Sequence, residues 1–364
     1  MRAAAYRRFG GPDTVRVEEL PRPSVGPDDV LVRVHASTVS AADHRARSRE
    51  VPRGLWLLAA FGIGAFRPKR RVLGMDVAGV VEAVGPEVTR FAPGDEVIGM
   101  LGARFGGHAE YARLRQDGAL ALKPRNMSFE DAVTLVFGGL TAHGFLEQAD
   151  LGPGVSVLVN GASGAVGTAA VQLAEHAGAH VTGICSGANR ELVASLGADR
   201  VIDYTIDDFT AGTDTYDVIV DCVGNAPFER VAHLLKLGGA LLLVITDLAG
   251  VLRAPWRSRR TGKRVTAQVG KATAEDLAFL VGLAEAGHYR AVRDRTYDLA
   301  DIVEAHRFVD TGRKCGNVVV RIADGGSRAT SGADDLHGGR GLPRGLNRHP
   351  AAPTDRYRGK AHSR

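Results

Sequence analysis

The feature that most constrains the fold of this chain is a regular alternation, from about residue 126 onward, of short apolar runs and helix-length segments. The β-rich runs begin near residues 155, 180, 201, 217 and 240, and segments of helical length and period separate them. Strands connected in this way require right-handed crossovers, which build a parallel sheet covered on both faces. The sequence therefore predicts a doubly wound α/β domain over residues 126–289.

The first 125 residues have the pattern of an irregular β domain, with short strands broken by glycine and proline. Over residues 30–36, apolar side chains alternate with Arg33 and His35, which is the period-two pattern of a half-buried strand. A last apolar strand near the end of the ordered sequence is expected to return to this domain. We therefore expect residues 1–125 to be completed by residues from about 290 to 322.

Residues 323–364 have a composition unlike the rest of the chain. They contain one aromatic residue, Tyr357, and no apolar periodicity, so they cannot bury enough surface to offset the entropy of ordering. We expect a disordered basic tail. It carries a net charge of +4 of the formal +5 of the whole chain, which leaves the remainder nearly neutral. This location of the charge argues against a nucleic-acid partner for the folded part.

Cysteine usage and hydropathy indicate a cytoplasmic protein. The three cysteines, Cys185, Cys222 and Cys315, are widely spaced and form no CxxC pair, which fits a reducing compartment. The amino terminus has no apolar run of the signal-peptide type. The longest apolar stretch, residues 55–66, is shorter than the roughly 20 residues that span a bilayer. We expect no membrane insertion, although basic residues on both sides of this stretch leave a surface-binding alternative open.

A glycine-rich loop directly follows the first strand of the predicted α/β domain and directly precedes a helix-like run. Small residues in such a loop allow a sharp turn, close approach of backbone amides to a pyrophosphate, and tight packing of the helix on its strand. The alternative is a tight strand-to-helix turn without a ligand. The residues predicted to bind a dinucleotide here are Gly161, Ser163, Gly164, Ala165, Val166 and Gly167.

The end of the second strand favours NADPH over NADH. An NAD site places a carboxylate there to hold the ribose 2′-hydroxyl, but no carboxylate occurs before Glu191. Ser186 can donate a hydrogen bond to a 2′-phosphate, and Arg190 can pair with its charge. Tyr204, after the third strand, could add a hydroxyl on the adenosine side. The alternative for Arg190 is a solvated charge on a helix.

Several motifs together resemble the zinc-lacking, quinone oxidoreductase-like branch of the medium-chain dehydrogenase/reductase superfamily. The resemblance covers nearly all of residues 1–322. The motifs are Val39-Ser40-Ala41-Ala42-Asp43, Gly74-Met75-Asp76-Val77-Ala78-Gly79, Phe91-Ala92-Pro93-Gly94-Asp95-Glu96-Val97, Gly139-Leu140-Thr141-Ala142, the glycine loop and Leu196 to Tyr204. The resemblance implies a GroES-like β domain plus a doubly wound Rossmann domain, with the cofactor in the cleft between them.

The resemblance also bears on metal and chemistry. Zinc-dependent relatives carry a His-Glu pair where this chain has Met75 and Asp76, and a cysteine near Ser40. Neither a catalytic nor a structural metal is therefore expected. Without a Lewis acid, the easier reaction is NADPH-dependent hydride transfer to a quinone or an α,β-unsaturated carbonyl, so the expected substrate is small, apolar and conjugated. The alternatives are a metal-free carbonyl or alcohol dehydrogenase and a catalytically weak nucleotide-binding sensor.

The remaining residue roles are carried over from the resemblance. They place Thr141, Gly224, Asn225 and Asn317 at the cofactor, although Asn317 stands where the branch usually has lysine. Ser40 and Asp43 are the candidate catalytic residues on the substrate side, with a structural turn as the alternative for Ser40. Two further polar candidates near the cleft are Tyr6 and His44, and residues 50–69 are expected to cover its mouth. A homodimer is compatible with the resemblance.

Overall fold

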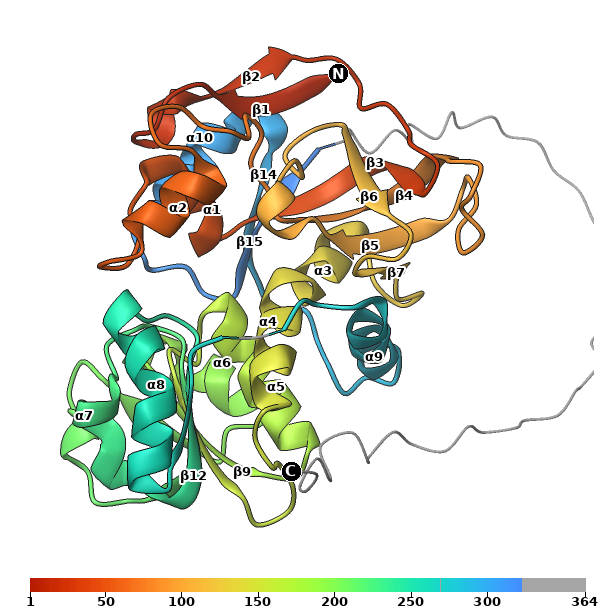
Figure 1. The fold of residues 1–364 in the computed structure, drawn as a ribbon. Helices are drawn as coiled ribbons and strands as arrows, with labels where there is room; N and C mark the ends of the chain where they lie inside the picture. The colour runs from red at the N-terminus through yellow and green to blue at the C-terminus, as the bar shows by residue number, and fades with distance from the viewer. Residues whose placement is uncertain (269, 323–364) are drawn as a thin grey trace, which may run out of the picture.

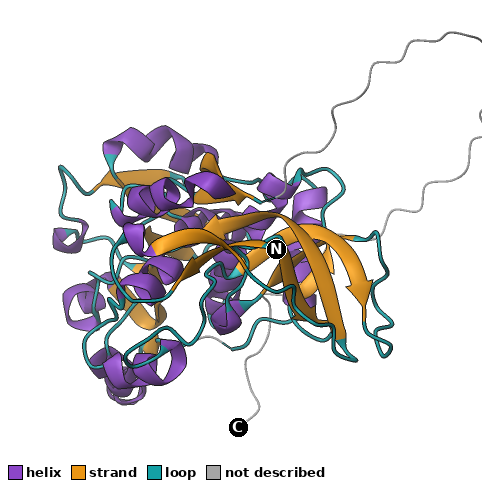
Figure 2. Cartoon of the chain, turned by 90° about the horizontal axis from the view of Figure 1, so that it is seen from above, coloured by secondary structure: helices purple, strands orange, loops and turns teal. Residues whose placement is uncertain are grey.

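The computed structural model describes residues 1–268 and 270–322, which form two lobes (Figure 1). The predicted tail, residues 323–364, lies outside the described residues. The first lobe is built mainly from β1 (Arg2–Tyr6), β2 (Val15–Glu19), β3 (Asp29–Val39), β4 (Asp76–Val84), β5 (Glu96–Met100), β6 (Tyr111–Arg115) and β7 (Leu120–Leu122). Seen from above, its strands curve across the molecule with helices gathered mainly along one side (Figure 2).

The chain returns to this first lobe at its carboxyl-terminal end. There the chain forms β14 (Arg293–Asp298), helix α10 (Ile302–Asp310) and β15 (Asn317–Arg321), in that order. Strand β15 pairs antiparallel with β3, with Val318 opposite Val39, and the sheet runs in the order β14-β15-β3-β4-β5-β7, with β6 paired to β3. The chain therefore passes between the lobes twice. A cofactor bound between the lobes would contact both lobes.

The second lobe holds a six-stranded parallel sheet. Its strands are β8 (Ser156–Asn160), β9 (His180–Cys185), β10 (Arg200–Asp203), β11 (Tyr216–Asp221), β12 (Leu235–Leu243) and β13 (Arg264–Thr266), in the order β10-β9-β8-β11-β12-β13. This is the doubly wound order of a Rossmann domain, in which ligands bind where the strand order reverses, here between β8 and β11. The predicted fold class, a GroES-like β domain plus a doubly wound Rossmann domain, is confirmed.

Helices cover both faces of this sheet. They are α4 (Phe137–Leu146), α5 (Ala165–His176), α6 (Arg190–Ser195), α7 (Phe228–Val231), α8 (Leu248–Thr261) and α9 (Ala274–Glu285), whereas α3 (Phe129–Ala132) packs against β3, β4 and β15 of the first lobe. Along β8, Val157 and Val159 belong to the core shared with α4, α5 and α9, whereas Leu158 belongs to the core shared with α7 and α8. Burial of consecutive apolar residues on opposite faces explains the continuous apolar run in the sequence.

Two helices of the first lobe, α1 (Ala41–Ser48) and α2 (Trp56–Ile63), lie near the second lobe (Figure 1). Single 3₁₀ turns occur at Pro12–Thr14, Gly102–Arg104, Val133–Leu135, Gly187–Asn189, Phe209–Ala211, Ala232–Leu234 and Leu299–Asp301. In the described part of the chain, every helix is too short or too polar to cross a bilayer.

Candidate active site

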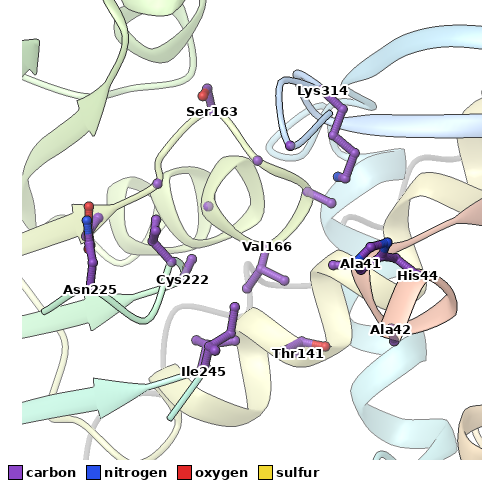
Figure 3. A pocket seen from close by; sticks show the side chains of 18 of the residues that line it. Ala41, Ala42, His44, Thr141, Ser163, Val166, Cys222, Asn225, Ile245 and Lys314 are labelled. Atoms are coloured by element: carbon purple, nitrogen blue, oxygen red, sulfur yellow. The ribbon is translucent and has the colours of Figure 1, made fainter. Parts of the chain in front are cut away.

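A cavity of about 1070 Å³ lies between the two lobes (Figure 3). It opens at the carboxyl ends of β8 and β11, the position that the strand order of the Rossmann sheet favours for a ligand. Its walls include Ala41, Ala42, His44 and Arg45 of α1, Thr141 of α4, Gly161 and Ser163 to Gly167, Tyr204, Cys222, Val223 and Asn225, Val244 and Ile245, and Lys314. Its volume suits a dinucleotide together with a small second molecule.

The glycine loop brings a helix terminus to the wall of this cavity. Gly161 has a φ of +80°, and a Cβ on Gly167 would lie 2.0 Å from the Gly161 carbonyl oxygen. Only small residues therefore let α5 begin so close to β8. Gly164 caps α5 without a side-chain hydrogen bond, so the first N–H groups of the helix stay available to a ligand. Free N–H groups and the helix dipole favour a pyrophosphate at this point.

A buried carboxylate organises the loop that follows β11. Asp221 accepts hydrogen bonds from the backbone N–H groups of Val223, Gly224 and Ala226 at 3.0, 2.9 and 3.0 Å. It also accepts a bond from the Nδ2 of Asn160 at 2.8 Å, and this amide reaches Asn225 at 2.6 Å. The network joins the ends of β8 and β11. Asn225 consequently lines the cavity, whereas Gly224 is not among the lining residues.

The residues predicted near an adenosine 2′-phosphate lie around the end of β9. Tyr204 lines the cavity, while Ser186 and the exposed Arg190 lie outside its lining. Asp203, at the end of β10, is the register partner of Cys185 at the end of β9. Its carboxylate accepts bonds from the N and Oγ1 of Thr205 at 2.9 and 2.7 Å. These bonds lower the pKa of Asp203. The Oδ1 of Asp203 is therefore already bonded within the turn that follows β10.

Ser40 and Asp43 are placed together, but away from the cavity. Ser40 caps α1 and Asp43 bonds back to it: the Oδ2 of Asp43 accepts from the N and Oγ of Ser40 at 2.8 and 2.6 Å. Its Oδ1 accepts from the backbone N of Gly74 at 2.7 Å. Both residues are buried and neither lines the cavity. Their polar atoms hold α1 against the Gly74 turn, so we assign them no catalytic role.

His44, named from the sequence without a role, is the histidine of α1 that reaches the cavity. Its Nδ1 lies 2.7 Å from Asp310 and its Nε2 lies 3.2 Å from Glu50. Asp310, on α10, also accepts bonds of 2.5 and 2.6 Å from the buried Arg47. The imidazole is thus held in place at both ring nitrogens by carboxylates that lie outside α1. Tyr6 is buried outside the cavity lining.

Lys314 is a site residue that the sequence reasoning missed. It projects between the glycine loop and α1 (Figure 3), and its Nζ donates to the Gly316 carbonyl at 2.7 Å. Its segment is bonded to the glycine loop, because the N of Gly316 donates to the Ser163 carbonyl at 2.7 Å. Burial lowers the pKa of Lys314 to about 8. A lysine two residues before the predicted Gly316-Asn317 pair was the available signal.

Two other predicted cofactor residues differ in placement. Thr141 lines the cavity, and its Oγ1 donates to the Phe137 carbonyl at 2.7 Å, which leaves the oxygen able to accept a bond. Asn317 is buried outside the lining, and its Nδ2 donates to the Val292 carbonyl at 3.1 Å. Asn317 therefore secures the start of β15. The cation at this corner of the cavity comes from Lys314.

Among the described residues, one group of possible metal ligands has its ligand atoms close together: His143, Glu147 and Asp276. These residues come from α4, the residue after it, and α9, and none of them lines the cavity. Burial raises the pKa of the cavity thiol Cys185 to about 11 and raises that of Cys222 further, so both are neutral thiols near pH 7. Among the described residues that line the cavity, no three such ligand atoms lie close enough together to form a candidate metal site.

Comparison with known proteins identifies the family. Residues 26–124 match the alcohol dehydrogenase GroES-like domain, and residues 196–320 match a domain described as zinc-binding dehydrogenase. The chain is 32% identical to 2-methylene-furan-3-one reductase of Solanum lycopersicum, over 88% of this chain and 79% of the relative. It belongs to the quinone oxidoreductase-like branch of the medium-chain dehydrogenase/reductase superfamily.

Other members of this branch match over most of their length. Quinone-oxidoreductase QR1 of Triphysaria versicolor is 31% identical over 88% of this chain and 98% of its own. The solved structure of the quinone oxidoreductase from Coxiella burnetii superposes with a TM-score of 0.79 at 27% identity and covers 89% of this chain and 99% of that one. Membership shows an oxidoreductase of the NAD(P)-dependent type.

Proposed function

We propose that this oxidoreductase uses NADPH, without zinc, to reduce quinones or α,β-unsaturated carbonyl compounds. The observation that carries the proposal is the cavity itself, in which an uncapped helix terminus on a glycine loop faces a wall made by α1 and Lys314. One further relative, 30% identical over 88% of this chain, is an NADPH-dependent alkenal/one oxidoreductase of Arabidopsis thaliana. Its name supports this substrate class.

The residues present fit a nicotinamide dinucleotide. The first turn of α5 would hold the pyrophosphate, and Asn225 and Tyr204 line the wall on either side. The bound nicotinamide would supply a hydride to the conjugated system. Phe137, Phe145 and Ile245 contribute apolar surface to the wall, which favours a flat apolar substrate and limits water.

The chain's own polar groups account for the proton and the developing negative charge. His44 lines the cavity with its two ring nitrogens on Asp310 and Glu50, so its Nε2 would reach a substrate once the exposed Glu50 gives up its bond. Arg45 also lines the cavity, and burial lowers its pKa without removing its charge near neutral pH. A conjugated oxygen that gains charge on reduction would find both groups on α1. In this proposal, His44 and Arg45 take the place of a metal ion in stabilising the charge on the substrate oxygen.

The test is oxidation of NADPH by the purified full chain with a panel of quinones, enones and enals. We expect turnover with at least one conjugated acceptor and little with a saturated aldehyde of the same carbon skeleton. Reduction of the carbonyl in preference to the double bond would instead favour the carbonyl reductase alternative. Absence of both NADPH binding and NADPH oxidation would overturn the proposal.

Replacing Lys314 with methionine is expected to weaken NADPH binding about tenfold at pH 7, because a cation beside the glycine loop is lost. The pKa of Lys314 is about 8, so the ammonium form predominates below that pH and is lost above it. Affinity of the unmodified protein should therefore fall as pH rises through 8, and the gap to the variant should close by about pH 9 to 10.

Nucleotide fluorescence titration across this pH range measures the effect. The matched control is Arg313→Met, which removes the exposed cation next along the chain and should leave affinity within about twofold. A Lys314→Arg variant should retain tight binding above pH 8, since guanidinium stays charged. Equal losses for Lys314→Met at pH 7 and pH 10 would contradict a charge-based role.

A further inference from the structure

Two strongly basic segments border the mouth of the cavity. Residues 51–71 and 248–263 contain ten lysines and arginines and no aspartate or glutamate. Residues 1–322 as a whole carry a net charge of only +1, so the rest of that span is net negative. The positive charge of the described protein is therefore concentrated on one part of its surface rather than spread evenly.

The two segments touch one another beside the cavity. The N of Leu248, which begins α8, donates to the Arg53 carbonyl at 3.0 Å, and a Cβ on Gly54 would lie 2.8 Å from the Cβ of Leu248. Both segments begin close to the cavity, because the lining residue Glu50 is three residues before Arg53 and the lining residue Ile245 is three residues before Leu248. In Figure 1, α2 and α8 lie on the same side of the molecule. They form one continuous face at the mouth.

Large apolar side chains on this face are exposed. On α8, Leu252 and Trp256 are one turn apart and are 68% and 57% exposed. On and after α2, Trp56, Phe61 and Phe66 are 57%, 82% and 93% exposed. Single exposed apolar residues are ordinary, but five of this size in two adjoining segments indicate a surface that meets something apolar.

Cations on this face lie against its aromatic rings. The guanidinium of Arg260 lies 5.1 Å from the Trp256 ring centroid, and the Lys69 ammonium lies 4.7 Å from that of Phe61. Arg257 differs, because it is buried and paired with Glu229. Tryptophan, phenylalanine and leucine interleaved with Lys and Arg that have no carboxylate partner in the same two segments are typical of surfaces that bind at the interface of an anionic bilayer.

We propose that this face, residues 51–71 together with α8, docks on an anionic lipid surface with the cavity mouth turned toward the bilayer. An apolar quinone or lipid-derived enal dissolved in the bilayer would then enter without crossing water, a consequence that rests on the proposed function. The docking itself does not depend on that function. It requires no membrane-spanning helix, since the apolar side chains reach only the headgroup boundary.

A second copy of the chain fits this face poorly. A two-fold axis through the face would bring its nine cations other than the buried Arg257 against nine like charges, with no carboxylate in either segment, which is repulsive. A nucleic acid would satisfy the charge and could stack bases on the aromatic rings, so the comparison with an oligonucleotide belongs to the test; the exposed aliphatic Leu252 beside Trp256 favours lipid. An anionic lipid surface matches both the charge and the aliphatic and aromatic side chains.

The test is co-sedimentation of the full chain with vesicles of phosphatidylcholine alone and of phosphatidylcholine with phosphatidylserine in a three-to-one ratio. We expect binding to the anionic vesicles only, weakened by added salt. The double variant Arg259→Glu/Arg260→Glu should lower partitioning by about tenfold or more, and Leu252→Ser/Trp256→Ser should lower it severalfold. Residues 323–364 are present throughout, so their charge contributes equally to every measurement.

Matched controls separate this face from general charge and exposure. Arg8→Glu and Leu237→Ser alter exposed residues of the same types outside the two segments, and each should change partitioning by less than about twofold. The proposal is overturned if anionic vesicles do not bind the protein or if the face variants bind as well as the unmodified chain. Preference for a single-stranded oligonucleotide, or loss of a dimer in the same variants, would equally overturn it.

Enzymatic assay of the same proteins keeps this proposal distinct from the proposed function. With a water-soluble quinone and no vesicles, the α8 variants should oxidise NADPH as fast as the unmodified chain, since none of their altered residues lines the cavity. Vesicle binding without any NADPH oxidation would leave the docking face standing and would remove the proposed reaction. NADPH oxidation without vesicle binding would leave the proposed reaction standing and would remove the docking face.

Discussion

Replacing Asp43 with alanine is expected to lower the free energy of unfolding by roughly 3 to 5 kcal/mol. The carboxylate is fully buried and accepts the backbone N–H groups of Ser40 and Gly74, as well as the Ser40 hydroxyl. Alanine would leave two buried backbone donors without partners, and each costs about 1–3 kcal/mol. It would also remove half of the capping box of α1. Chemical denaturation, followed by circular dichroism, measures the loss.

Two further variants make this prediction specific. Ser40→Ala removes the cap and the hydroxyl bond to Asp43 and should cost about 1–2 kcal/mol, while Asp43→Asn keeps one acceptor oxygen and should fall between that loss and the loss for alanine at position 43. Below the unfolding transition, Ser40→Ala should retain most of the NADPH-dependent activity, because Ser40 lies outside the cavity lining. A large loss of turnover in a fully folded Ser40→Ala protein would restore the catalytic interpretation of this pair.

The sequence predicted the Rossmann sheet well because its signal is local and dense. Consecutive apolar residues such as Val157, Leu158 and Val159 are needed when a strand is buried on both faces. Helix α1 was harder to predict, since residues 41–48 are mostly polar or small and bury only part of one side. Its start was nevertheless marked by Ser40 and Asp43, the serine and acidic residue, three positions apart, of a capping box.

The site was predictable where one segment supplies it and unpredictable where distant segments meet. The glycine loop, Thr141, Tyr204 and Asn225 all line the cavity, and their predicted role in cofactor binding stays a prediction. Lys314 reaches it only because Gly316 bonds to Ser163, which is a contact between the two lobes. Similarly, His44 acquires its orientation from Asp310, a residue of α10. Contacts of this long range leave no periodic trace in a sequence.

Replacing Arg190 with alanine is expected to weaken NADPH binding by roughly ten- to a hundredfold and to leave NADH nearly unchanged. A hydrogen bond to a charged group contributes about 1.5–3 kcal/mol, which corresponds to that range. Arg190 is exposed at the start of α6, and Ser186 and Tyr204 directly follow the carboxyl ends of the neighbouring parallel strands β9 and β10. Asp203, the adjacent carboxylate, accepts both bonds from Thr205 at its Oδ1, so a ribose contact there would have to use its other oxygen.

The measurement is a pair of titrations, one with each nucleotide, on the same protein preparations. The control is Arg125→Ala, which removes an exposed arginine in the segment between β7 and α3. It should leave both affinities unchanged. Arg190→Glu should go further than alanine, because a carboxylate repels the 2′-phosphate yet can accept from a ribose 2′-hydroxyl. That variant should therefore bind NADH better than NADPH. Equal weakening of both nucleotides by Arg190→Ala would show that the arginine does not contact the 2′-phosphate and would withdraw the structural reason for preferring NADPH.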